Sequence, residues 1–181
     1  MCIYKFRVFV FINFVLWVGS TNASAEMFPK IKAGLWETTM AVSEGPEKTK
    51  RVWSLQCIDT ATLKELFEFG VRSNDERCSK NTTQISGNKI TVSSKCNVAK
   101  SIVTSKTVTT FDSDVGYRTE SISIYEPAFS GRELDRTLSE VKHIGPCKAG
   151  MRLGDALSSV TPTPVTVNML DVIRGAKKPK Q

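Results

Sequence analysis

The sequence predicts a mainly β protein: a curved antiparallel sheet, as a meander or half-barrel, with one short helix after the second strand and a short C-terminal helix. Two observations predict this class. Several runs alternate apolar and polar side chains and are rich in Val, Ile, Thr and aromatic residues, as half-buried strands are. Short segments of Gly, Pro, Asn and Asp separate the runs, as hairpin turns do. A length of 181 residues is typical of one domain.

The first 25 residues have the layout of a cleaved signal peptide. Two cations precede an apolar run of 11 residues at 8–18, and Ala23-Ser24-Ala25 offers the small residues that signal peptidase accepts. The run is shorter than the roughly 20 residues of a transmembrane helix. We therefore expect a periplasmic or secreted protein that does not span the membrane after cleavage. The expected organisation is a signal peptide over 1–25, a disulfide-bonded antiparallel β domain over 26–160, and a Pro-containing linker, short helix and basic tail over 161–181.

The runs 34–43 and 49–58 predict the first hairpin. Trp36 and Met40 share a face of the first strand, Trp53 lies on the apolar face of the second, and the Gly-Pro segment between the runs predicts a turn. We expect the two tryptophans to face the same side of the sheet.

A short helix is expected next. Asp59 or Thr60 can cap its N-terminus, three apolar side chains share a face before Phe69, and Gly70 ends it. The polar residues 71–81 are expected to form a loop.

Three further runs predict strands. Residues 89–98 alternate cleanly, with Ile90 and Val92 on the inward face. The runs 101–111 and 115–125 are rich in Thr, Val, Ile and Tyr, and the Asp-Ser-Asp segment between them predicts a second hairpin.

The stretch 130–144 is ambiguous. Ser130 and Glu133 could form a capping box, and apolar residues recur at helical spacing. A strand over the same residues would place Leu134, Leu138 and Ile144 on one face together with three charged side chains. Periodicity alone therefore favours a helix. A second short helix is expected over 168–174.

Four cysteines follow the signal peptide, and an even number in an exported chain indicates two disulfide bonds. Of the three possible pairings we favour Cys78–Cys96, which closes a short loop around a turn, and Cys57–Cys147, which ties an early strand to the end of the sheet. The chain has no C-x-x-C spacing, which argues against a zinc or redox role.

The charge of +7 is concentrated at one end. Without the signal peptide the net charge is +5, and four cations lie in the last eight residues, so the remainder is +1. The positive net charge therefore comes mainly from a C-terminal tail and not from a nucleic-acid-binding groove, and we expect no nucleic-acid partner.

Catalytic chemistry has little support. His143 is the only histidine, and the sequence pairs it with no nucleophile. Glu133 and Asp135 could share one face of a strand, which is more typical of a solvated acidic edge than of a Ca²⁺ site. Nucleophile-elbow and dinucleotide-binding motifs are absent. We expect no enzyme activity, cofactor or metal.

An apolar sheet face is the candidate binding feature. If it forms a cleft wall rather than a core layer, its residues would be Trp36, Met40, Trp53, Ile90 and Val92. A chain of this size with one sheet and short helices cannot easily cover both faces, so an exposed apolar face would need a ligand or partner.

Several short motifs occur in a characteristic order. They are the run Ile31-Lys32-Ala33-Gly34-Leu35-Trp36-Glu37-Thr38-Thr39-Met40, Gln56-Cys57-Ile58-Asp59, the pair Cys78 and Cys96, Ile144-Gly145-Pro146-Cys147, Gly150, and Gly154-Asp155. Over residues 31–155 the chain thereby resembles a bacterial family of exported proteins of unknown function. The resemblance implies a periplasmic domain of mostly antiparallel strands held by disulfides, and it implies no reaction. It also implies a strand over 133–144, and we adopt this prediction against the periodicity.

The expected function is non-enzymatic binding of a small apolar ligand or an envelope component. The alternative is a protein-interaction module of the cell envelope that uses strand edges or the basic C-terminal tail.

Overall fold

A computed structural model describes residues 28–43, 49–75, 77–158 and 166–176. The expected signal peptide, the first turn, the Pro-containing linker and the last five residues lie outside this part. Nine strands are described, namely β1 (Gly34–Ser43), β2 (Thr49–Ile58), β3 (Cys78–Ser86), β4 (Lys89–Val98), β5 (Ser101–Ser113), β6 (Gly116–Phe129), β7 (Arg132–Gly145), β8 (Asp155–Ser158) and β9 (Thr166–Asn168). The two helices are α1 (Thr60–Asp75) and α2 (Met169–Ala176).

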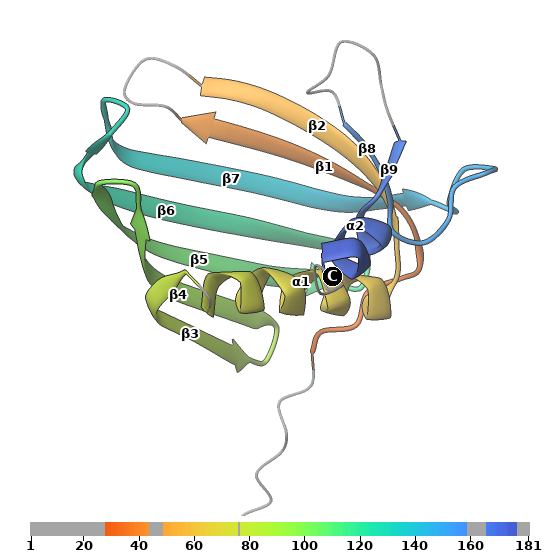
Figure 1. Cartoon of the computed structure of the whole chain (residues 1–181). Coiled ribbons are helices and arrows are strands. Elements are labelled where there is room, and N and C mark those ends of the chain that lie inside the picture. The colour runs from red at the N-terminus through yellow and green to blue at the C-terminus, as the bar shows by residue number, and fades with distance from the viewer. Residues whose placement is uncertain (1–27, 44–48, 76, 159–165, 177–181) are drawn as a thin grey trace, which may run out of the picture.

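The strands form one antiparallel sheet in the order β3-β4-β5-β6-β7-β1-β2-β8-β9. Strands β3 to β7 form a continuous meander, and the first hairpin then adds to it through β1, which pairs with β7. The sheet curves but does not close, and both helices lie on the same side of it (Figure 1). The predicted fold class is confirmed.

Helix α1 begins where predicted. The backbone N–H of Thr62 donates to the Asp59 carboxylate at 2.8 Å, which makes Asp59 the N-cap. The Thr60 hydroxyl accepts from the N–H of Ile31 and donates to its carbonyl, at 2.9 and 3.1 Å, so the helix start is fixed to the segment that precedes β1. None of the helices in the described ranges has the length and apolar character needed to cross a membrane.

The predicted end of α1 at Gly70 and the loop at 71–81 are wrong. The helix continues to Asp75, and β3 starts at Cys78. The Asn81 side chain donates to the Val71 carbonyl at 3.0 Å and to the Asp75 carboxylate at 2.8 Å. These contacts from the sheet hold the last helical turn, and they offset the roughly 1 kcal/mol that a glycine costs inside a helix.

The ambiguous stretch is a strand, and the helix that its periodicity favours is wrong. Strand β7 lies inside the sheet and pairs with β6 on one side and β1 on the other. Backbone hydrogen bonds on both edges therefore outweigh the helical spacing of its apolar residues, as tertiary pairing often overrides local propensity.

The C-terminal segment completes the fold. Strand β9, which the sequence did not indicate, pairs with β8. The expected short helix is present as α2, where Asn168 caps the first turn and Leu170 and Ile173 are buried. Arg174 of α2 forms an ion pair with Glu65 of α1 at 3.1 Å. Residues 166–176 thus pack against the rest of the described domain.

Both predicted disulfides are present. Cys78–Cys96 joins directly facing residues of β3 and β4, and Cys57–Cys147 joins β2 to the segment after β7.

Candidate ligand-binding surface

The face of the sheet under α1, here called the helix-covered face, carries the main core. Its buried residues are Ile31, Trp36, Ile58, Ile90, Phe111 and Val141. Trp36 is completely buried, its ring packs against Tyr117 and His143, and its indole N–H donates to the Lys32 carbonyl at 3.0 Å. Burial also raises the pKa of Tyr117 to about 12.

The residues predicted to form a ligand face are split between the core and the opposite face. Ile90 is buried, Val92 packs against the core cluster, and Met40 is half-buried on the same face as Trp36. Trp53 pairs with Thr39 in the β1–β2 register, so it points to the other face, where it is 43% exposed. The prediction that the two tryptophans face the same side is wrong.

The reason lies at the end of β2, where both faces are buried. Ile58 belongs to the helix-covered core, while Leu55 and Cys57 are buried on the opposite face, next to the disulfide with Cys147. The apolar alternation of a strand identifies its core face only when one face is buried. The alternation in β2 predicts that the face with Trp53, Leu55 and Cys57 points into the main core. In the structure this face lies opposite that core, and only its end at Leu55 and Cys57 is buried.

The space left on the helix-covered face is small. A cavity of about 220 Å³ lies between α1 and the sheet, and its walls include Phe28, Leu63, Phe67 and Ile90. Ligand pockets commonly measure about 300–1,000 Å³. The described part of this face is therefore a packed core rather than a ligand pocket.

Further along β5, β6 and β7, the apolar side chains change to the other face. On the helix-covered face this region carries hydroxyl pairs that hydrogen-bond across the strands, namely Ser105–Ser123, Thr107–Ser121 and Thr109–Thr119 at 2.8, 2.9 and 3.0 Å. The face without helices, here called the open face, carries the exposed apolar residues Ile102, Ile122, Ile124, Leu134 and Leu138. An antiparallel sheet usually turns its polar side to water, and this region does the reverse.

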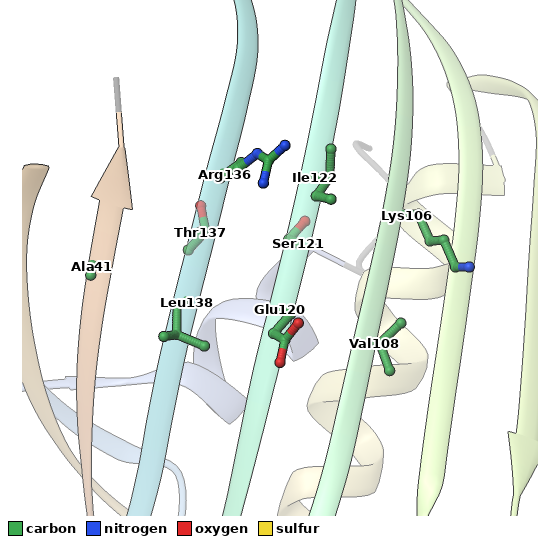
Figure 2. A pocket seen from close by; sticks show the side chains of 9 residues that line it. All are labelled: Ala41, Lys106, Val108, Glu120, Ser121, Ile122, Arg136, Thr137 and Leu138. Atoms are coloured by element: carbon green, nitrogen blue, oxygen red, sulfur yellow. The ribbon is translucent and has the colours of Figure 1, made fainter. Parts of the chain in front are cut away.

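These apolar residues border a hollow of about 690 Å³, here called the open-face hollow. It is lined by Ala41, Lys106, Val108, Glu120, Ser121, Ile122, Arg136, Thr137 and Leu138. Figure 2 shows these residues on the four neighbouring strands β1, β7, β6 and β5, with the helices behind the sheet. Arg136 extends from β7 toward Ile122 on β6.

A second hollow of about 550 Å³ continues the first toward β3. The two share Lys106 and Ile122, and the second adds Lys80, Lys95 and Ile124. The combined groove is therefore apolar along its centre and cationic at several points of its wall.

The residues considered for catalysis have structural partners. The His143 ring packs edge-on against Trp36, and its Nε2 lies 3.3 Å from the Ala33 carbonyl. Asp135 accepts a hydrogen bond from the Tyr125 hydroxyl at 2.7 Å and lies 3.5 Å from Arg132. Burial and this hydrogen bond raise the pKa of Tyr125. In the part of the chain that is described, no group of three or more His, Cys, Asp or Glu side chains is placed to hold a metal ion.

The fold and this surface define a disulfide-bonded domain built on one open antiparallel sheet. The chain belongs to the family described as Protein of unknown function (DUF3617), whose model matches residues 31–147. The predicted resemblance to an uncharacterised family is thereby confirmed. No curated protein and no solved structure matches the chain.

The residues that suggested a family make structural contacts. Gly34 lies against the end of β7, Trp36 fills the core, and Cys57 and Cys147 form a disulfide. Asp155, beyond the matched range, is buried and accepts hydrogen bonds from two neighbours. These motifs thus preserve the fold, and none of them lines the open-face hollow.

Proposed function

We propose that this protein is an exported, non-enzymatic binding domain that takes up an apolar ligand in the open-face hollow. One observation carries the proposal: Ile122 and Leu138 are 41% and 44% exposed on a sheet face that the described helices leave uncovered. Contiguous apolar surface of this kind marks ligand or partner sites in soluble proteins. The hollow also has the volume of a small-molecule site.

Two further observations support the remaining parts of the proposal. The sole histidine is engaged with Trp36 and the Ala33 carbonyl, which favours a structural role over general-base catalysis. The two disulfides are compatible with an oxidising compartment, as export would provide.

Binding can be tested with the uncharged dye N-phenyl-1-naphthylamine, whose fluorescence rises in apolar surroundings. We expect the wild-type domain to bind it, and the double variant Ile122→Asn/Leu138→Asn to bind about tenfold more weakly, because two apolar contacts are lost. Both side chains are already exposed, so the fold should survive, as circular dichroism will verify.

The matched control is Val172→Asn, which changes an apolar residue that is 52% exposed on α2, on the other side of the sheet. Unchanged dye binding in the double variant, or an equal loss in the control, would refute the assignment of the hollow. Native mass spectrometry of the purified domain, before and after delipidation, gives an independent measure of bound ligand.

A further inference from the structure

The groove on the open face carries an excess of positive charge. Its wall includes Lys80, Lys95, Lys106 and Arg136, and the acidic residue among the lining side chains is Glu120. Glu120 is neutralised in part by Arg118, 4.0 Å away on the same strand. Among the described residues, none of the four cations in the wall forms an ion pair.

The cations flank apolar side chains in the rows that cross the sheet. Lys106 of β5, Ile122 of β6 and Arg136 of β7 are direct cross-strand neighbours. Two strand spacings separate the outer members, so their Cα atoms lie about 10 Å apart. The adjacent row places Ile124 beside Leu134, and the row on the other side places Leu138 between Ala41 and Glu120. Apolar side chains therefore lie on both sides of the row that holds Lys106 and Arg136. The distance between these two cations leaves room for one anionic group.

Charge distinguishes among the possible occupants. A second copy of the chain, docked through the same face in a two-fold arrangement, would bring two cation-rich surfaces together. Like charges at an interface are unfavourable. A wholly apolar ligand would leave the cations unpaired, and an inorganic anion would leave the apolar side chains exposed. An amphiphile with an anionic head group satisfies both parts of the groove.

Building on the proposed function, we propose that the open-face hollow binds an anionic amphiphile. Its phosphate or carboxylate head lies between Lys106 and Arg136, and its acyl chain covers the apolar residues of β6 and β7. Charge-assisted hydrogen bonds from a guanidinium and an ammonium group are the contacts that such head groups favour.

Calorimetry with three probes below their micelle concentrations tests the head-group preference: dodecyl phosphate, dodecyltrimethylammonium and inorganic phosphate. We expect dodecyl phosphate to bind, the cationic detergent to bind at least about tenfold more weakly, and inorganic phosphate alone to give no measurable heat. Added salt should weaken the binding of dodecyl phosphate, because the cations are exposed.

The variant Lys106→Gln/Arg136→Gln should lose about tenfold in affinity for dodecyl phosphate, which corresponds to the loss of charged hydrogen bonds, and should keep its affinity for N-phenyl-1-naphthylamine. The control Arg72→Gln/Lys100→Gln removes the same charge outside the groove and should leave both affinities unchanged.

The head-group assignment would be overturned if the anionic and cationic detergents bound equally, or if Lys106→Gln/Arg136→Gln bound dodecyl phosphate as the wild type does. Neither outcome would affect the dye result. A dimer in sedimentation experiments that Leu138→Asn dissociates would also overturn it, because the face would then be occupied by a second copy. If the wild-type domain does not bind the dye, the proposed function itself is refuted.

Discussion

Gly34 occupies a position at the start of β1 that a larger residue cannot take. Its φ of +148° is unfavourable for residues with a side chain, and an added Cβ would meet the Gly145 carbonyl and come within 2.5 Å of the His143 Nε2. The same contact region supports Trp36, which packs against His143. The close approach of β1 and β7 therefore explains the glycine at this position.

We predict that Gly34→Ala destabilises the domain by about 2–6 kcal/mol, since backbone strain and overpacking each cost about 1–3 kcal/mol. Urea unfolding followed by tryptophan fluorescence gives the value. Gly70→Ala is the control: it lies inside α1 with no atom near its added Cβ, and it should stabilise the domain by about 0.5–1 kcal/mol. A Gly34→Ala variant as stable as wild type would show that the β1–β7 contact can relax.

In each of the strands β6 and β7, the apolar side chains face the core at one end and the open side at the other. Near Tyr117 and Val141 the apolar side chains enter the core, and toward Ile122 and Leu134 they face the open side. Leu134 and Leu138 lie on the open face and Val141 lies in the core, and this change of face gives 130–144 the helical spacing of its apolar residues. The helix-like pattern therefore arises where the strand passes from the core to the candidate binding surface.

The junction of β8, β9 and α2 depends on Asp155. Its carboxylate accepts hydrogen bonds from the Arg152 N–H and the Asn168 side chain, both at 2.7 Å, and Asn168 also caps α2. The hydrogen bond from the Arg152 backbone, followed by that from Asn168, lowers the pKa of Asp155 below its ordinary value of 3.8. A carboxyl group with a lowered pKa in the folded state stabilises the fold above its ordinary pKa, and that stabilisation is lost as the pH falls through the lower value.

Asp155→Asn should accordingly lower the melting temperature at pH 7, and its difference from wild type should narrow once the pH falls below about 4. Thermal melts between pH 2 and pH 8 measure both effects. Asp112→Asn, at an exposed hairpin position, serves as the control for the Asp-to-Asn change itself and should leave the melting temperature at pH 7 close to that of wild type. A constant gap between Asp155→Asn and wild type across this range would contradict the role of the carboxylate charge.

The whole molecule is a single sheet whose covered and uncovered regions are set by the helices. Helix α1 covers one part of one face, α2 packs beside α1, and the open face of the central strands has no cover among the described residues. The folded unit also extends past the family match at residue 147, because β8, β9 and α2 add to it.

We therefore predict that a chain ending at Ser158 is less stable than one ending at Ala176. The shorter chain loses the buried side chains Leu170 and Ile173, each worth about 1.5–3 kcal/mol, which is a large share of the 5–15 kcal/mol typical of a domain. Urea midpoints of the two chains measure the difference. Equal midpoints for the Ser158 and Ala176 chains would show that α2 contributes no stability.

Features that depend on local order could be predicted from the amino-acid sequence. Alternating side chains located β1 and β2 to the residue, Asp59 and Thr60 marked the start of α1, and the even cysteine count with its spacings indicated the two disulfides. Each of these features is fixed by neighbours in the chain or by a covalent bond.

The tertiary structure alone decided which face each strand buries. Trp53 turned to the open face because the β1–β2 register pairs it with Thr39, and α1 continued past Gly70 because Asn81 of β3 holds its last turn. Strand β9 formed because β8 offered an edge. A period of two fixes the alternation of side chains within a strand, but register, helix position and free edges decide which side is buried. The open-face hollow arises from that decision.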